Sequence, residues 1–311
     1  MGARSGSLEG RLGLLVAARA VGVESLLAGL PLPVPFLFAV VTQLGDVWFY
    51  FLTLTTAYWV GDAVRGNDRR TAALLLGCAL CALAVTTTLK GVFDLPRPPG
   101  SSVATGADQL SGLVRAFYLD AATAEGPGFP SGHALGSALV WGAAALTLGG
   151  SRRLRFAVGG LVVLLVGLSR LVLGVHFLVD VLVGWAVGGF ILAFLLRVGA
   201  DRKPGRALSL AALVALVGAI GNFDVTHLTV FGATLGARIA WGAVGGDALR
   251  VPTTRRSGLA LTAVGLPLLG VPFALLYTVD TTPVTSFAVA GLITAGVIVL
   301  PLVGDVTRSR V

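Results

Sequence analysis

Charged residues are scarce in this 311-residue sequence. Asp, Glu, Lys and Arg together make up 12% of it, about half of the ~25% share that is usual in soluble domains. Hydrophobic residues make up 55%, and the mean hydropathy is +0.89. A soluble core cannot bury so much apolar surface. Repeated apolar runs of roughly 17–20 residues instead match the helix length that crosses about 30 Å of hydrocarbon, so we expect a multi-pass membrane protein.

Cysteine is almost absent as well. Cys78 and Cys81 are the two that the sequence contains, and both lie inside the apolar run Thr71–Leu89. A disulfide or a metal site at that position would lack water and further ligands. We therefore expect two small buried hydrophobic residues at these positions. Because apolar runs continue to Val303, a lone cleaved signal peptide does not account for the pattern.

The hydropathy pattern predicts an all-α membrane protein with ten spans. The predicted spans are 30–44, 47–64, 71–90, 132–150, 154–171, 176–197, 207–223, 227–246, 258–277 and 284–303. We divide the chain into an N-terminal cytoplasmic or interfacial segment (1–29), a six-helix membrane domain (30–200) and a C-terminal four-helix region (201–311).

The first predicted span is the least regular. Pro31, Pro33 and Pro35 crowd its start, and the preceding stretch carries Arg19 and Glu24. Whether the first apolar segment crosses fully stays open, and residues 12–30 can instead form an amphipathic helix in the membrane interface.

The basic residues are distributed asymmetrically between the two predicted sides. One side receives Arg4, Arg11, Arg19, Arg65, Arg69, Arg70, Arg152, Arg153, Arg155, Arg197, Arg202, Lys203, Arg206, Arg250, Arg255, Arg256, Arg308 and Arg310. The other receives Lys90, Arg97, Arg115 and Arg170. By the positive-inside rule the first side is cytoplasmic, as are both termini. This placement argues for membrane topology and against nucleic-acid binding as the reason for the net charge of +8.

Three of the few cations on the predicted outer side lie at helix ends. Lys90 is followed after six residues by Arg97-Pro98, and Arg170 ends another span. Arg offers forked donors to phosphate oxygens and Lys offers a point charge, so together they predict an oxyanion site. The alternative is that each side chain extends to the interface without a further role.

The segment Pro130-Ser131-Gly132-His133 opens the fourth of the long spans. Free backbone N–H groups and the helix dipole favour an anion there. Gly132 allows close backbone approach, and Ser131 can cap the helix while donating to the same anion. Capping alone is the alternative for this segment.

His176 and Asp180 are four residues apart at the start of the predicted span 176–197, just after Ser169-Arg170. On a helix this spacing places both on one face. The carboxylate can then accept the Nδ1–H and leave the Nε2 lone pair free, which a histidine nucleophile needs. A structural His–Asp pair is the alternative. However, an ionisable residue one turn inside a membrane helix is functional by default, and the sequence contains just three histidines and two lysines.

Together these segments resemble the tripartite signature of the type 2 phosphatidic acid phosphatase superfamily, which also includes vanadium haloperoxidases and bacterial acid phosphatases. Every position of Lys90-x6-Arg97-Pro98, Pro130–His133 and Ser169-Arg170-x5-His176-x3-Asp180 is filled in order. The resemblance covers residues of about 30–197 and implies a six-helix core.

The resemblance also implies roles for these residues. His176 would attack phosphorus, Asp180 would orient it, and His133 would protonate the leaving group. Phosphoryl oxygens would be held by Lys90, Arg97, Ser131, Gly132 and Arg170. It further implies hydrolysis of a lipid phosphate, such as phosphatidic acid, phosphatidylglycerophosphate or an isoprenyl diphosphate, with no metal and no cofactor. The alternatives are a membrane phosphotransferase, and a lipid transporter or scaffold that uses the C-terminal helices; haloperoxidase chemistry is less favoured.

Two regions stay open. The loop Pro99–Phe129 joins two of the motifs and is either a lid or headgroup selector, or a disordered connector. Residues 201–311 carry no recognisable motif. There, His227 can extend the outer site, but a lone histidine at a helix end is more typical of a satisfied interfacial residue. The sequence does not indicate an oligomeric state.

Overall fold

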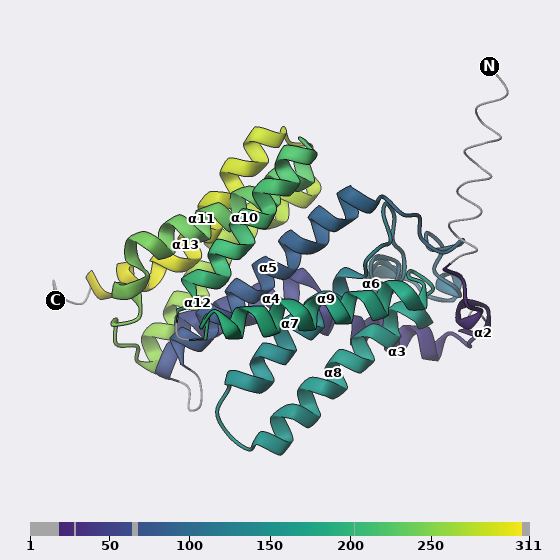
Figure 1. Ribbon diagram of the computed structural model, residues 1–311, viewed down its shortest axis with the longest axis horizontal. Coiled ribbons are helices and arrows are strands. Elements are labelled where there is room, and N and C mark those ends of the chain that lie inside the picture. Colours follow the sequence, from purple (N-terminus) through teal and green to yellow (C-terminus); the bar gives the residue numbers. More distant parts are fainter. Residues whose placement is uncertain (1–18, 28, 64–67, 202, 307–311) are drawn as a thin grey trace.

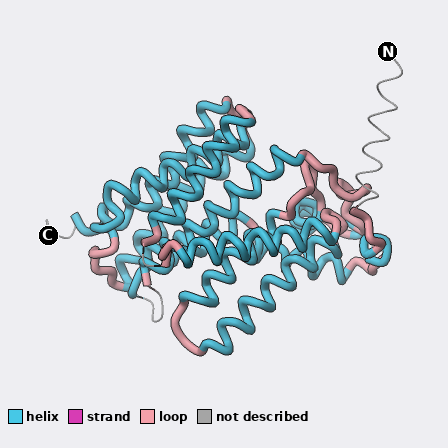
Figure 2. The backbone as a smooth tube through the Cα atoms, viewed as in Figure 1, coloured by secondary structure: helices cyan, strands magenta, loops and turns pink. Residues whose placement is uncertain are grey.

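A computed structural model describes residues 19–306, apart from residues 28, 64–67 and 202. All regular elements in this part of the chain are helices (Figure 2). They are α2 (Val23–Leu27), α3 (Pro33–Thr42), α4 (Val47–Val60), α5 (Arg69–Phe93), α6 (Gly112–Ala122), α7 (Gly132–Thr147), α8 (Arg152–Val172), α9 (Leu178–Arg197), α10 (Gly205–Gly221), α11 (Val225–Ala248), α12 (Arg255–Thr278) and α13 (Pro283–Val306). Most of the predicted N-terminal segment 1–29 lies outside the described residues.

Six of the described helices are long and apolar enough to cross a membrane: α5, α8, α9, α11, α12 and α13. The shorter α10 is also apolar. The chain is therefore an all-α integral membrane protein, as predicted. The four C-terminal helices α10–α13 are likewise confirmed, and they stand beside the N-terminal helices as a second group (Figure 1).

The prediction of two separate spans at 30–44 and 47–64 is wrong. Helices α3 and α4 contain 10 and 14 residues, which at 1.5 Å per residue gives roughly 15 Å and 21 Å, too short for about 30 Å of hydrocarbon. The two helices meet at a 47° bend and qualify as a span only as a pair. The break is the short 3₁₀ turn Gln43–Gly45 followed by Asp46, whose side chain caps α4 by accepting from Trp48 N.

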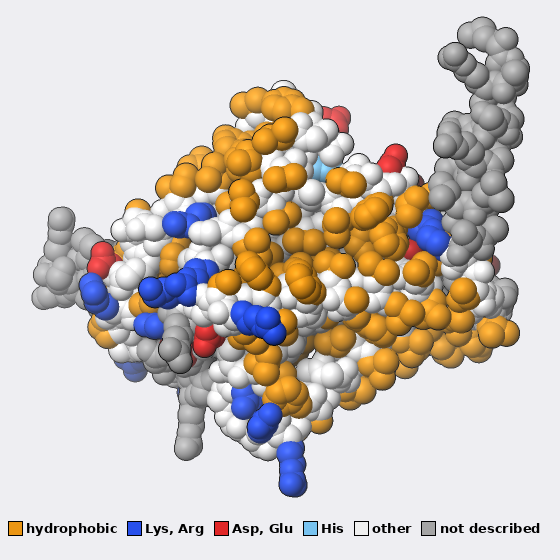
Figure 3. All heavy atoms as spheres, viewed as in Figure 1, with side chains coloured by type: hydrophobic (Ala, Val, Ile, Leu, Met, Phe, Trp, Pro, Cys, Tyr) orange, Lys and Arg blue, Asp and Glu red, His pale blue; other side chains and the backbone are white. Residues whose placement is uncertain are grey.

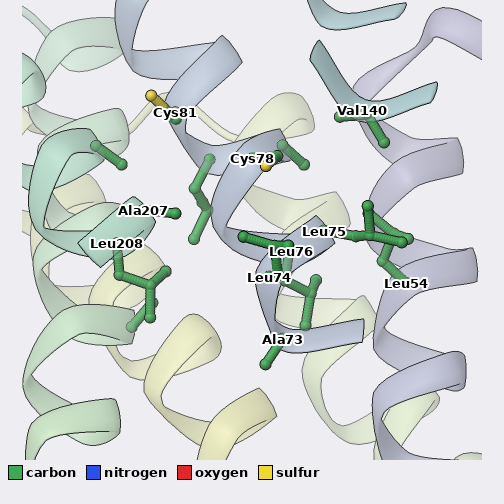
Figure 4. Close-up of a cluster of buried hydrophobic side chains, with 14 of the residues drawn as sticks. Leu54, Ala73, Leu74, Leu75, Leu76, Cys78, Cys81, Val140, Ala207 and Leu208 are labelled. Carbon is green, nitrogen blue, oxygen red and sulfur yellow. The ribbon is translucent and has the colours of Figure 1, made fainter. Parts of the chain in front are cut away.

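Helix α5 is the centre of the molecule and packs against α4, α7, α10 and α11. Figure 4 shows the side chains around its middle, including Leu74, Leu75 and Leu76 from α5 with Leu54 from α4 and Leu208 from α10. A helix surrounded by neighbours is apolar on all sides.

The two cysteines belong to the same cluster. Cys78 and Cys81 are free and buried in α5, as the sequence predicted.

Basic residues gather at one end of the helix bundle, which we call the basic end. It contains the starts of α5, α8, α10 and α12 and the ends of α9 and α11, as far as the structure describes them. In Figure 3 the Lys and Arg side chains concentrate at the left and lower margins, while hydrophobic atoms cover most of the middle of this face. The opposite end, which we call the site end, contains the end of α5, the start of α7, the end of α8 and the start of α9.

Helices α7 and α9 approach closely through glycines. A Cβ atom on Gly188 would lie 2.5 Å from the carbonyl oxygen of Leu135, and one on Gly184 would lie 2.7 Å from that of Ser131. Backbone atoms cannot move aside as flexible side chains do, so these glycines fix the distance between the two helices. That distance positions the start of α7 against the start of α9.

We expect Gly188→Ala to destabilise the fold by about 1–3 kcal/mol, because the added methyl group forces α7 and α9 apart. Thermal unfolding in detergent measures this as a lower Tm. Gly189→Ala is the matched control, since a Cβ at Gly189 meets nothing within 4 Å. A Tm for Gly188→Ala equal to that of the control would contradict the packing argument.

Candidate active site

The three sequence motifs meet at the site end of the bundle. Because successive long helices run in opposite directions, the end of α5, the start of α7, the end of α8 and the start of α9 lie on the same side (Figure 1). Each of these four termini contributes one or more of the predicted residues. Residues separated by up to 90 positions in the sequence are thereby brought into one region.

His176 lies in the turn between α8 and α9, and not on the helix itself as the spacing had predicted. Helix α9 begins at Leu178 because the Asp180 carboxylate accepts from the Phe177 backbone N–H at 3.0 Å and so caps its first turn. The expected pairing is nevertheless present. His176 Nδ1 lies 3.4 Å from Asp180 Oδ2, and both side chains are buried.

Arg97 defines which nitrogen of His176 carries the lone pair. Its Nη1 lies 3.2 Å from His176 Nε2 and donates to the Val175 carbonyl at 2.9 Å, while its Nε donates to the Glu125 carbonyl at 3.1 Å. A guanidinium can donate but cannot accept. The contact therefore requires an unprotonated Nε2, which leaves the ring hydrogen on Nδ1, facing Asp180.

Burial and positive neighbours lower the pKa of His176 well below its usual 6.5. Burial is the largest cause, followed by the charges of Arg170, Arg97 and Lys90. A desolvated imidazolium among cations is disfavoured, so the ring stays neutral at neutral pH. A neutral imidazole whose Nε2 carries a lone pair and no hydrogen is the form that can attack an electrophile.

Arg170 and Ser131 lie in the same buried layer. Arg170 donates from Nη1 to Thr42 Oγ1 at 2.7 Å, and its buried Nε has no hydrogen-bond partner among the described residues. The side chain of Ser131 caps α7 by accepting from Ala134 N at 3.4 Å, and its own backbone N–H donates to the Asp180 carbonyl at 3.0 Å. That last bond joins α7 directly to α9.

A cavity of about 570 Å³ adjoins this layer and is lined by Lys90, Gly132 and His133. Its volume is typical of small-molecule pockets. Gly132 is needed for close packing, since a Cβ there would lie 2.8 Å from Thr86 Cγ2. His176, Arg97 and Arg170 are not among the residues that line this cavity, but the charge of Lys90, which does line it, helps to lower the pKa of His176.

Arg19 is a site residue that the sequence argument assigned to the opposite membrane face, and that assignment is wrong. Its Nη1 forms an ion pair with Asp180 Oδ1 at 3.0 Å, its Nη2 donates to the Pro96 carbonyl, and its guanidinium lies 4.7 Å from the centre of the Phe177 ring. The error follows from counting α3 and α4 as two crossings. The signal was present, because an arginine within an apolar stretch is expected to have a specific partner.

Asp46 is a second residue that the motifs did not indicate. Its Oδ2 lies 3.5 Å from His133 Nε2, at the bend between α3 and α4. This is an ion-pair distance and too long for a strong hydrogen bond. The carboxylate can orient the ring of His133, and only the tertiary structure brings the two together.

The loop Pro99–Phe129 contains helix α6 and is therefore not a disordered connector. Helix α6 packs against α3, with the ring of Phe36 6.4 Å from Phe117 and 5.9 Å from Tyr118. The loop also holds Arg97 through the Glu125 carbonyl. Its role as a lid or headgroup selector stays a prediction.

His227 lies on the same cavity as Lys90 and His133, although the sequence favoured an ordinary interfacial residue. It is 7% exposed, and its Nε2 has no hydrogen-bond partner among the described residues. The neighbouring side chain of Asn222 lines the cavity too.

Comparison with known proteins agrees with the arrangement of the motifs. The sequence pattern of the PAP2 superfamily matches residues 71–204, which include all three motifs. Phosphatidylglycerophosphatase B of Bacillus subtilis (strain 168) is 38% identical to this chain over 85 residues, which is 25% of this chain and 41% of that protein. The aligned part is thus less than half of that relative's length. No solved structure matches this chain.

A family pattern, a related phosphatase sequence and a helix bundle that collects all three motifs at one end agree with one another. The segment 71–204 therefore resembles the PAP2 superfamily in sequence, and its three motifs meet at one end of the helix bundle.

Proposed function

We propose that this protein hydrolyses a phosphate ester of a membrane lipid through a covalent phosphohistidine at His176. One observation carries the proposal: the buried, neutral imidazole of His176 is held between Asp180 at Nδ1 and Arg97 at Nε2. A nucleophile oriented by a carboxylate and placed beside a cation is the arrangement that phosphoryl transfer requires. The match of residues 71–204 to the PAP2 superfamily supports the same chemistry.

In the first step His176 Nε2 attacks phosphorus, and the bond between phosphorus and the ester oxygen breaks. The leaving alkoxide takes a proton from His133, which Asp46 orients. The ring of His176 becomes positively charged as the N–P bond forms, and Asp180 stabilises this charge through Nδ1–H. The products are the free lipid alcohol and the phosphoenzyme.

In the second step water attacks the phosphohistidine. His133, now neutral, takes a proton from the water, the N–P bond breaks, and the electron pair returns to Nε2. Inorganic phosphate leaves, and the original protonation states of both histidines are restored. No other reactant is required.

The remaining motif residues stabilise the phosphoryl oxygens. Arg97 and Arg170 supply guanidinium donors, and Lys90 supplies a positive charge on the cavity wall. The backbone N–H groups that open α7 at Gly132 add the positive end of the helix dipole. Charge stabilisation of this kind supplies most of the rate enhancement in phosphoryl transfer.

A lipid substrate follows from the position of the site. The cavity opens among the ends of apolar helices, so a headgroup can enter it while the acyl or prenyl chains stay in the bilayer. Phosphatidic acid, phosphatidylglycerophosphate and isoprenyl diphosphates all have this form. The related Bacillus protein is by its name a phosphatidylglycerophosphatase, which places that lipid among the first to test.

We also propose that the site end faces away from the cytoplasm, in the plasma membrane. The basic end contains Arg69, Arg152 and Arg255 at helix starts, and positive residues favour the cytoplasmic face. The basic residues remain unequally divided between the two ends when Arg19 is counted at the site end. This position of Arg19 does mean that the described chain begins on the same side as the site.

Inorganic phosphate should raise the Tm of the purified protein, because a ligand that binds only the folded state stabilises it. Arg97→Gln should reduce this shift by more than half, since it removes the cation beside His176. Arg115→Gln is the control, because Arg115 is an exposed cation of α6. Equal phosphate shifts in both variants would argue against the oxyanion site.

His176→Ala should lower the rate of phosphate release more than about a thousandfold, because no nucleophile remains. The assay is phosphate release from a panel of lipid phosphates in detergent, with EDTA present, and an unchanged Tm shows that the variant is folded. Wild-type activity should persist in EDTA. Retained activity in the variant would exclude the covalent mechanism, and transfer of phosphate to an added alcohol would reveal a phosphotransferase.

The pH profile of kcat/KM should show that His176 stays active below pH 6.5. Because its pKa is lowered, the neutral nucleophile persists into the acid range, and activity is lost only as the pH falls through the lowered pKa. Arg97→Gln removes a neighbouring positive charge, so the pKa should rise and the acid limb should move to higher pH. An acid limb that does not move would contradict this electrostatic role of Arg97.

A further inference from the structure

The cavity beside the site is shared between the PAP2 part of the chain and the C-terminal helices. Lys90, Gly132 and His133 line one side, while Asn222, Asp224 and His227 from the α10–α11 turn line the other. The second set lies beyond residue 204, where the family pattern ends. Helices α10 and α11 both pack against α5, which holds the two sides in a fixed relation.

His227 is held in place by Asp224. Asp224 caps α11 by accepting from the His227 backbone N–H at 2.8 Å, and its carboxylate oxygens lie 2.8 Å and 3.0 Å from His227 Nδ1. The ring is therefore fixed at Nδ1. Its Nε2 is buried on the cavity without a hydrogen-bond partner among the described residues.

Unpartnered buried polar atoms concentrate on this one cavity. Besides His227 Nε2, the hydroxyl oxygens of Tyr50 and Thr86 are buried without hydrogen bonds in the described part of the chain, and both residues line the same space. His133 Nε2 lines it as well and has no hydrogen bond there, although Asp46 Oδ2 lies at an ion-pair distance of 3.5 Å. Leaving a buried polar group unpaired is unfavourable. Several such groups around one cavity indicate a polar ligand that pairs with them.

Two glycines allow His227 to reach this position. A Cβ on Gly91 would lie 2.7 Å from both His227 Nε2 and Asn222 Nδ2, and a Cβ on Gly218 would lie 3.3 Å from His227 Cδ2. Gly91 directly follows Lys90 in the sequence. His227 and Asn222, on one side of the cavity, thus pack against the residue that follows Lys90, which lies on the other side.

In the second set, Asp224 and His227 favour a ligand that donates hydrogen bonds. With Nδ1–H directed at Asp224, the Nε2 of His227 can only accept, and the Asp224 carboxylate also accepts. A phosphate oxygen is an acceptor and does not satisfy such a pair, whereas a hydroxyl group does. The side of the cavity that carries Lys90, together with the nearby Arg97 and Arg170, thus suits a phosphate, and the α10–α11 side suits a neutral hydroxylated group.

We infer that Asn222, Asp224 and His227 form a subsite for the hydroxyl groups of a polyol headgroup, next to the leaving oxygen of the bound lipid phosphate. This inference rests on the proposed function for the identity of the reaction, but the binding of hydroxyl groups does not depend on catalysis. The C-terminal helices then determine which lipid phosphate is preferred. Substrates whose leaving alcohol carries a further free hydroxyl gain a hydrogen bond that phosphatidic acid cannot form.

A binding experiment tests the subsite without catalysis. Short-chain phosphatidylglycerol and phosphatidylethanol have the same phosphodiester charge and differ in the hydroxyl groups of the headgroup. Phosphatidylglycerol should raise the Tm of the wild type more than phosphatidylethanol does, and His227→Leu should abolish the difference. Equal shifts in the wild type, or a difference that persists in His227→Leu, would overturn the inference.

A kinetic experiment tests its consequence. His227→Leu should lower kcat/KM for phosphatidylglycerophosphate about tenfold, the value of one lost hydrogen bond, and change that for phosphatidic acid less than twofold. Asn222→Leu should show the same selective loss if His227→Leu does not fold. Thr229→Ala is the control and should change neither value, because Thr229 lies on the same helix but does not line the cavity.

The two proposals fail in different ways. A wild type that releases phosphate from neither lipid rejects the proposed function, while the difference between the two phosphodiesters still decides the subsite. Equal losses on both substrates at an unchanged Tm show a role for His227 in the reaction itself and reject its role in selecting the headgroup.

Discussion

The buried carboxylate of Asp180 is the group on which the geometry of the site depends. Its side chain is fully buried, and an ionised carboxylate in such a place requires partners. It has three: the Arg19 guanidinium, the Phe177 backbone N–H and His176 Nδ1. Its own carbonyl also accepts from Ser131 N. One residue thus joins the N-terminal segment, the starts of α7 and α9, and His176.

This arrangement gives the two halves of the chain different tasks around one cavity. The PAP2 part concentrates positive charge near His176, where the proposed phosphoryl transfer would develop negative charge on the phosphoryl oxygens. The α10–α11 turn contributes hydrogen-bond acceptors and amide groups around His227. Because α5 contacts both halves, changes in the packing of the C-terminal helices reach the cavity directly.

Much of the site could be predicted because motif residues are recognisable by type and spacing. Lys90, Arg97, Ser131, His133 and His176 all lie at the site end, as the order of the helices required. The bend at Gln43–Asp46 could not be predicted, because hydropathy measures apolar length and does not register a change of direction. Arg19 was misplaced as a result. Asp46 was missed since its partner is distant in the sequence.

The sequence by itself determined that the chain is helical and membrane-embedded, and it specified the three motifs, because apolar length and motif spacing are local properties. Only the tertiary structure decided which end of the bundle Arg19 occupies and that His227 shares a cavity with Lys90. It also decided the tautomer of His176, through the contact with Arg97. These features depend on contacts between helices far apart in the chain. Gly91 and Gly188 allow such contacts because they have no side chain, and the sequence does not show which residues pack against them.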